Sequence, residues 1–232
     1  ANACGTAAGL YDPLPEIAQV CRDYAIWLHV DAAHGGGALV SRKYRYLMEG
    51  IELADSVIWD AHKMLRTPNV CAAVLVRQHQ HLDQAFSQEA SYLFHKKDQP
   101  GFDFIPRTLE CTKAALGLRL FMTIAGMGEQ GLEDHVDFII DMAKLSAEYI
   151  DAQDDFEVAV MPEINILCFR TGEDNDQQLE IRRRLLETGN FFISTTLYRG
   201  KRWLRLVFMN PLITLDELKD LIAEIREIRE NL

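Results

Sequence analysis

Two short apolar runs in the first quarter of the chain each end directly before an aspartate. The run Ile-Trp-Leu-His-Val precedes Asp31, and the run Ser-Val-Ile-Trp precedes Asp60. Such runs, bounded by turn residues, are typical of strands buried on both faces of a parallel sheet. The polar segment between them fits a crossover with a helical turn, and a right-handed crossover brings both carboxyl ends to one edge. Because ligands bind at that edge in open α/β sheets, we expect Asp31 and the nearby Lys63 to converge on one crevice.

The second half of the chain alternates between apolar runs and segments of helical period. The order of these strands and helices predicts an antiparallel sheet with helices on one face. The expected strands are residues 1–6, 26–30, 56–59, 70–76, 156–160, 165–170, 191–198 and 203–208, and the expected helices are 13–24, 44–49, 78–88, 112–127, 132–152, 178–187 and 215–228. We interpret the chain as α/β, with residues 1–112 belonging to a large parallel-sheet domain and residues 113–232 forming linking helices and a small α+β domain.

Shorter signals refine these elements. Asp12 is expected to cap the first helix, with Pro13 at its first position. The three glycines at 35–37 permit positive φ and a close approach of the backbone, although they are also compatible with a simple loop. Residues 70–76 are expected to form a buried strand next to the turn that carries Lys63.

Composition narrows the class of protein. The chain has 232 residues, of which 48% are hydrophobic, which is enough for one large or two small domains. A net charge of −11 argues against a nucleic-acid partner. No apolar run is long enough to cross a membrane, so we expect no membrane partner. The five scattered cysteines fit neither a disulfide framework nor a metal site, which favours free buried thiols in a cytoplasmic, reducing compartment.

An amine and a carboxylate at one sheet edge suit one particular cofactor chemistry. A lysine amine can form a Schiff base with the aldehyde of pyridoxal 5'-phosphate, and a carboxylate can keep the ring nitrogen of that cofactor protonated. Aspartates and lysines at strand ends are also common as caps and surface charges. The spacing of Asp31 and Lys63 alone leaves both interpretations open.

Several motifs together make the chain resemble the group II pyridoxal-phosphate decarboxylases. These are His-Val-Asp-Ala-Ala at 29–33 with the glycines after it, Ala-Asp-Ser-Val at 54–57, His-Lys at 62–63, Ser-Tyr-Leu-Phe at 91–94, Arg-Thr-Leu-Glu-Cys at 107–111, Leu-Arg-Leu at 204–206 and Asn-Pro at 210–211. The resemblance extends over essentially the whole chain. It implies a fold-type-I architecture like that of aspartate aminotransferase, pyridoxal 5'-phosphate as cofactor, and a homodimer.

The resemblance assigns cofactor-binding roles to six residues. Lys63 corresponds to the Schiff-base lysine, and Asp31 to the partner of the pyridine nitrogen. His62 corresponds to a histidine that contacts the cofactor and the substrate carboxylate region. The other three cofactor neighbours are Ala33 against the pyridine face, Thr6, and Asp60. Asp60 stands where an asparagine near the phosphate is more usual, and an acid there would repel the phosphate unless it were hydrogen-bonded or protonated.

Two further residues are expected to bind substrate. Arg205 falls where members acting on acidic substrates place the arginine that grips the α-carboxylate, for which a guanidinium gives a bidentate match. Phe102 lies in the loop at 95–106, at the position where many members carry a tyrosine that protonates the α-carbon. That departure leaves the proton donor open among His62, His95, water and a tyrosine aligned elsewhere, and it raises transamination as a second class of outcome.

The expected reaction is decarboxylation of an L-α-amino acid. The Ser-Tyr-Leu-Phe motif favours an acidic substrate such as glutamate, aspartate or cysteine sulfinate. The Asp-x-His-Lys variant and the Asn-Pro ending favour L-2,4-diaminobutyrate instead. Because members of the family are roughly twice as long, we expect this sequence to represent their second half, completed by an N-terminal half of the same polypeptide. A non-enzymatic alternative is that the chain is an inactive fragment of such an enzyme.

Overall fold

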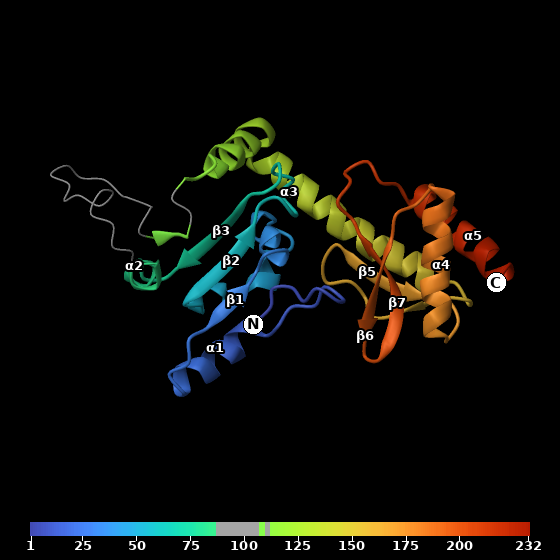
Figure 1. Cartoon of the computed structure of the whole chain (residues 1–232), viewed down its shortest axis with the longest axis horizontal. Coiled ribbons are helices and arrows are strands. Elements are labelled where there is room, and N and C mark those ends of the chain that lie inside the picture. The colour runs from blue at the N-terminus through green and yellow to red at the C-terminus, as the bar shows by residue number, and fades with distance from the viewer. Residues whose placement is uncertain (87–106, 110–111) are drawn as a thin grey trace.

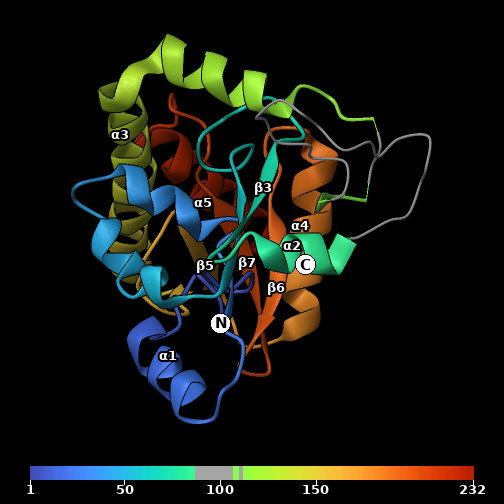
Figure 2. The same ribbon diagram turned by 90° about the vertical axis from the view of Figure 1, so that its left-hand side faces the viewer.

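Two β-sheets joined by one long helix form the framework of the protein. The computed structural model describes residues 1–86, 107–109 and 112–232 (Figure 1). Helix α3 (Leu116–Asp151) extends from the first sheet to the second. Figure 2 looks past β3 towards the second sheet, with α3 arching over both. This architecture agrees with the predicted α/β class, while the division at residue 112 remains a prediction.

The first sheet carries the two strands that end in aspartate. It has the order β1 (His29–Asp31), β2 (Ser56–Asp60), β3 (Ala72–Val76). Strands β1 and β2 are parallel, with His29 opposite Ser56, so the prediction that Asp31 and Asp60 end at the same edge is confirmed. Strand β3 runs antiparallel to β2. It forms within the predicted range, but the expectation of burial is wrong, because Val74 is 58% exposed on a side that the described elements leave uncovered.

Three 3₁₀ helices make up the crossover between β1 and β2. They are η1 (Gly35–Val40), η2 (Arg45–Met48) and η3 (Ile51–Leu53). The glycines at the start of η1 do not adopt positive φ, so that part of the prediction is wrong. The expected close approach is confirmed, since a Cβ on Gly35 would lie 2.4 Å from the carbonyl oxygen of Ala3, and one on Gly37 would lie 2.5 Å from Cβ of Met64.

The first residues of the chain add a short extended segment beside β1. Asn2 forms a parallel bridge with Asp31, and the Ala3 amide donates to the Asp31 carbonyl at 2.7 Å. Helix α1 (Leu14–Asp23) follows, with Pro13 at its N-cap. The predicted capping by Asp12 is wrong, because its carboxylate accepts from the backbone amide of Asn2 at 2.7 Å instead.

Helices α2 and α3 follow the first sheet. Helix α2 (Gln80–Phe86) lies within the range predicted for it. The expectation of two helices, at 112–127 and 132–152, is confirmed, because α3 consists of two helical segments that meet in a kink at Gly128, where φ is 70° and ψ is 170°. Only the second half of α3 is buried against the core. In the first half Phe121 is 62% exposed, together with Leu118, Met122 and Ile124.

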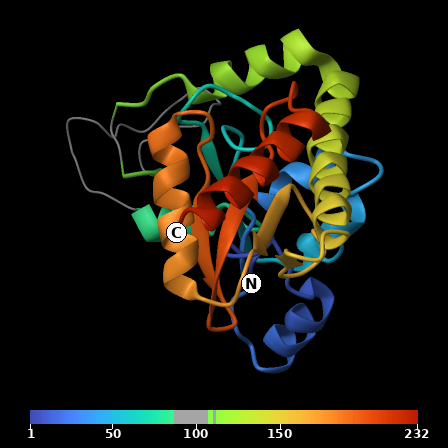
Figure 3. The ribbon, with the colours of Figure 1, turned by 90° about the vertical axis from the view of Figure 1, so that its right-hand side faces the viewer.

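The second sheet is antiparallel throughout, as predicted. Its order is β4 (Glu157–Val158), β5 (Ile166–Arg170), β7 (Lys201–Val207), β6 (Ser194–Tyr198). Helices α4 (Asn175–Thr188) and α5 (Leu215–Glu230) cover one face of this sheet (Figure 3). Helix α5 begins with a capping box between Thr214 and Glu217. No helix in the described part of the chain combines the length and the apolar character needed to span a bilayer.

Candidate active site

The turn after β2 presents the side chain of Lys63. The backbone amide of Lys63 donates to the Asp60 carbonyl at 3.1 Å, which closes the turn. Its Nζ lies 2.9 Å from Oδ2 of Asp60, with the two side chains 38% and 12% exposed. Because Asp60 is largely covered while Lys63 is more accessible, this ion pair orients the amine and leaves it exposed to solvent. Lys63 is therefore held at the sheet edge and remains open to a ligand.

Asp31 lies at the same edge, at the end of β1. Its backbone is held by Ala1 and Ala3, and Oδ1 accepts from the Ala33 amide at 3.0 Å. Oδ2 has no hydrogen-bond donor among the residues that the structure describes. The ends of β1 and β2 are tied together, because the Asp60 amide donates to the Ala33 carbonyl at 3.2 Å. Ala33 itself is half-buried, whereas Ala32 before it is fully buried in the core.

His62 is anchored to the start of the segment that leads into β3. Its Nδ1 lies 3.0 Å from the Cys71 carbonyl oxygen and 3.2 Å from the Cys71 amide nitrogen. Its Nε2 lies 4.0 Å from Oδ2 of Asp60, so this carboxylate stands between the imidazole and the Lys63 amine. The structure thus places His62 beside the lysine. Its contact with cofactor and substrate remains a prediction.

Arg205 reaches this region from the second sheet. It lies on β7, and its Nε donates to the backbone carbonyl of Thr6 at 3.2 Å. Two of the residues predicted from distant parts of the sequence are therefore in contact. Thr6 takes part in this contact through its backbone carbonyl. Contact between the Thr6 side chain and the cofactor remains a prediction.

The thiols of Cys4 and Cys168, near Arg205, are buried. Burial raises the pKa of Cys4 to about 12, even though Arg205 lowers it. Burial likewise raises the pKa of Cys168 to about 11, and its Sγ lies 3.2 Å from the Ala7 carbonyl. Both thiols therefore stay protonated at neutral pH. Cys71 is also buried, but Cys21 is only half-buried, so the expectation of burial is wrong for it, and Cys111 lies outside the described residues.

A further residue near the site was not identified from the sequence. His34 follows Ala33 directly, and its Nε2 lies 2.7 Å from Oδ1 of Asn165 in the second half of the chain. Its position inside the Asp-Ala-Ala-His-Gly motif could have indicated that it lies close to the site. The partner, 131 residues away, could not be inferred from that motif.

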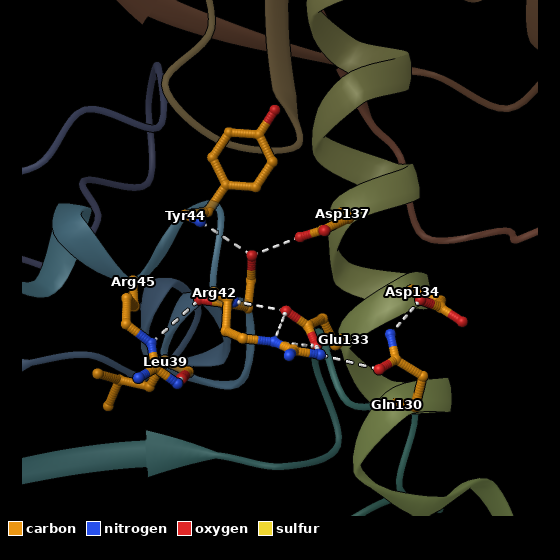
Figure 4. A network of polar contacts seen from close by, with 9 residues as sticks. Leu39, Arg42, Tyr44, Arg45, Gln130, Glu133, Asp134 and Asp137 are labelled. Atoms are coloured by element: carbon orange, nitrogen blue, oxygen red, sulfur yellow. Dashed lines mark hydrogen bonds and ion pairs between the residues drawn. The ribbon is translucent and has the colours of Figure 1, made fainter.

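A polar network supports the segment that follows the glycines (Figure 4). The Arg42 guanidinium donates through Nε to both carboxylate oxygens of Glu133 on α3, at 2.9 and 2.8 Å. The Arg42 amide donates to the same carboxylate at 2.8 Å. These bonds from Arg42 lower the pKa of Glu133 to about 2. Ser41 is fully buried and donates to Asp137 one turn further along α3. The network fixes the loop after Asp31 against the long helix.

The donor set at the sheet edge fits the reactive end of pyridoxal 5'-phosphate. Lys63 offers a primary amine for an aldehyde, and Asp31 keeps one carboxylate oxygen for a protonated ring nitrogen. An acid at position 60 was expected to repel the phosphate unless it was hydrogen-bonded or protonated, and the Asp60 carboxylate lies 2.9 Å from the Lys63 amine, which offsets its charge. Among the described residues there is no cluster of metal-ligating side chains. Phe102 and the motif at 91–94 lie outside the described residues.

Comparison with known proteins agrees with this chemistry. A family model described as the pyridoxal-dependent decarboxylase conserved domain matches residues 1–172. The acidic amino acid decarboxylase of Mus musculus is 31% identical over 95% of this chain and 44% of its own length. The cysteine sulfinic acid decarboxylase of Rattus norvegicus is 30% identical over 98% of this chain and 50% of its own length.

Solved structures show the same fold. A crystal structure of mouse CSAD superposes with a TM-score of 0.90 at 26% identity, covering 100% of this chain and 52% of that one. A structure of Oryza sativa TDC superposes with a TM-score of 0.92 at 24% identity, covering 100% of this chain and 50% of that one. The chain spans about half the length of the relatives that it matches.

Proposed function

Because this chain belongs to the pyridoxal-dependent decarboxylase family, we propose that the whole protein is a carboxy-lyase acting on an L-α-amino acid. One observation carries the proposal. The Lys63 amine and the Asp31 carboxylate come from the ends of adjacent parallel strands, whose loops are joined by the bond from the Asp60 amide to the Ala33 carbonyl. An amine and a carboxylate at one sheet edge are what pyridoxal chemistry requires of a protein.

Each residue at this edge would have a distinct task. Lys63 would bind the cofactor aldehyde through its amine, and Asp60 would hold that amine in place. Asp31 would keep a proton on the ring nitrogen, and Ala33 would leave room for the ring. The bound cofactor supplies an electron-accepting ring that takes up the electron pair released when the bond to the carboxylate breaks. His62 would lie beside the cofactor, close to where the substrate carboxylate enters.

We propose that the substrate is an acidic amino acid whose α-carboxylate is bound by Arg205. Two relatives that are 30–31% identical bear the names acidic amino acid decarboxylase and cysteine sulfinic acid decarboxylase, which supports this substrate class. A second candidate is L-2,4-diaminobutyrate, favoured by Asp60 in the Asp-x-His-Lys motif and by Asn210-Pro211. The two candidates differ in the charge of the substrate side chain.

The setting of the enzyme is also part of the proposal. We propose a cytoplasmic homodimer in which this half of the site is completed by an N-terminal half of the polypeptide. The exposed apolar side chains in the first half of α3, such as Phe121, would suit a contact with a second subunit. The reducing compartment is consistent with buried thiols such as Cys4 and Cys168.

Substrate screening with the whole protein tests the proposal. Release of carbon dioxide and formation of the amine are measured for glutamate, aspartate, cysteine sulfinate and diaminobutyrate, with the variant Lys63→Met as the blank. Turnover of one of the three acidic substrates supports the proposal, and turnover of diaminobutyrate alone replaces it by the second candidate. Absence of carbon dioxide with all four contradicts both and favours an inactive protein.

A further inference from the structure

His34 connects the edge of the first sheet to the second sheet. Its Nε2 lies 2.7 Å from Oδ1 of Asn165, a fully buried residue directly before β5. The side-chain amide of Asn165 donates to the Phe208 carbonyl at 2.7 Å, and the Phe208 amide donates back to the Asn165 carbonyl at 2.9 Å. Phe208 directly follows β7, three residues beyond Arg205. The imidazole is thus linked by hydrogen bonds to the strand that carries the predicted carboxylate-binding arginine.

The partners of Asn165 determine which nitrogen of His34 carries the proton. Nδ2 of Asn165 is committed to the Phe208 carbonyl, an acceptor, so Oδ1 is the atom that faces His34. An amide oxygen can only accept, so Nε2 of His34 must donate. Nδ1 of His34 then carries a lone pair, and it makes no hydrogen bond to any residue in the described ranges.

The surroundings keep this imidazole uncharged. Burial is the main cause that lowers the pKa of His34, and the nearby charges of Lys63 and Arg205 lower it further, against opposing effects of Asn165 and Asp60. The charges of Lys63 and Arg205 both act on the ring, so His34 lies near both residues. A neutral bridge of fixed tautomer does not change with pH in the physiological range.

The distance between Lys63 and Arg205 matters for the proposed reaction. The substrate would be linked through its amine at the Lys63 end and held by its carboxylate at the Arg205 end. Lys63 follows a strand of the first sheet and Arg205 lies on a strand of the second, and the guanidinium can bind the carboxylate bidentately only while the spacing between them is kept. The described contacts that hold the Arg205 strand to the site edge include the bond from Arg205 to Thr6 and the bridge from His34 to Asn165.

We propose that His34 is a positioning residue that, through Asn165, holds Arg205 at the correct distance from Lys63 and so sets the affinity for the substrate carboxylate. The inference rests on the proposed function of Arg205. It assigns a role to a residue that neither touches the reacting bond nor provides a charge. A structural contribution alone would lower stability without changing the affinity for a carboxylate.

Glutamine and asparagine at position 34 differ in whether their side-chain amide can reach Oδ1 of Asn165. Glutamine places its amide nitrogen near the position of Nε2 and can still donate to Asn165, whereas asparagine is one bond shorter and cannot. In the whole, cofactor-loaded protein, His34→Asn is expected to raise KM for the amino acid by about tenfold, the typical loss for one neutral hydrogen bond, with a smaller change in kcat. His34→Gln is expected to retain an affinity close to that of the unchanged protein.

A matched control and a second readout decide the inference. His29→Leu removes the bond of 2.8 Å between Nδ1 of His29 and Oγ of Ser56 at the opposite end of β1, and is expected to leave KM unchanged. Glutarate, a dicarboxylate without an amine, is titrated by calorimetry into the same proteins, and His34→Asn is expected to weaken its binding about tenfold. Equal glutarate affinity and equal KM in the asparagine and glutamine variants would overturn the inference. Because glutarate binding requires no turnover, it decides the role of His34 even if no carbon dioxide is released and the proposed function fails.

Discussion

Oδ2 of Asp60 lies 2.9 Å from Nζ of Lys63, three residues further along the turn. The carboxylate is 12% exposed and the amine side chain is 38% exposed, so solvent screens the pair only in part. The pair holds the lysine in one orientation at the end of β2. The positive charge of Lys63 also balances the negative charge of Asp60, which would otherwise repel a phosphate group.

The first prediction concerns this pair. The variants Asp60→Asn and Lys63→Met, alone and together, form a double-mutant cycle in urea unfolding. We expect a coupling free energy of about 1 kcal/mol, the upper end for partly exposed pairs, because Asp60 is largely covered. Strictly additive effects of the two substitutions would contradict an energetic role for the pair.

The second prediction concerns attachment of the cofactor. Borohydride reduction of the whole protein is expected to fix a pyridoxyl group on Lys63, detected by peptide mass spectrometry, because only a primary amine forms a reducible imine with the aldehyde. Lys63→Met should lose the adduct. Lys201→Met, which removes a half-exposed lysine 3.7 Å from Glu157, should keep it. An adduct on another lysine would refute the assignment.

The third prediction concerns recognition of the substrate carboxylate. Arg205→Lys keeps the positive charge but removes the planar pair of donors, so KM is expected to rise about tenfold. Arg202→Lys on the same strand, whose guanidinium donates to Thr195 at 3.1 Å, provides the matched control and should leave KM unchanged. Steady-state kinetics with both variants measures the difference. Equal KM values would show that Arg205 does not bind the carboxylate.

The fourth prediction is a pH dependence of stability that arises from Glu133. Bonds from Arg42 hold its pKa at about 2, below the ordinary value of 4.5. In acid the unfolded chain therefore takes up a proton before the folded one does, so this contribution is complete above pH 4.5 and is lost as the pH falls towards about 2. The difference in melting temperature between the wild type and Glu133→Gln is expected to shrink over that range. A constant difference would contradict the stabilising role of Arg42.

The fifth prediction concerns the glycines after Asp31. Gly35→Ala would place a Cβ 2.4 Å from the Ala3 carbonyl oxygen, and Ala3 is held in place because its amide donates to the Asp31 carbonyl at 2.7 Å. We expect destabilisation of about 2 kcal/mol in urea unfolding. Gly117→Ala, with nothing within 4 Å of the added carbon, should be neutral or stabilising. If both variants were equally stable, the close approach would not explain the glycine.

The sequence pattern predicts the sheet edge well because its rules are local. Asp31 and Asp60 each end an apolar run, and the handedness of crossovers is enough to bring them together. The contact between Arg205 and Thr6 joins residues 199 positions apart, and no periodicity carries that information. The resemblance to a family named both residues, but it did not predict their contact.

Some of the failed predictions were overturned by tertiary contacts that a local pattern does not contain. Asp12 has the chemistry of a helix cap, yet the nearby Asn2 amide takes its carboxylate. The glycines of η1 were expected to allow both positive φ and a close approach; only the close approach, to Ala3 and Met64, is present. His34 was not identified because its hydrogen-bond partner, Asn165, is 131 residues away, directly before a strand of the other sheet.

The first eleven residues run between the two sheets, and this affects how the protein unfolds. They pair with β1, while the Tyr11 backbone amide donates to the Glu163 carboxylate at 2.8 Å and the Ala7 carbonyl accepts from the Cys168 thiol. The buried apolar side chains of both sheets also form one continuous cluster. Because residues 1–11 contact both sheets, loss of structure in one sheet would also uncover part of the other. Thermal or chemical denaturation should therefore be cooperative across both sheets, with a single transition in which the cofactor edge and the Arg205 strand disappear together.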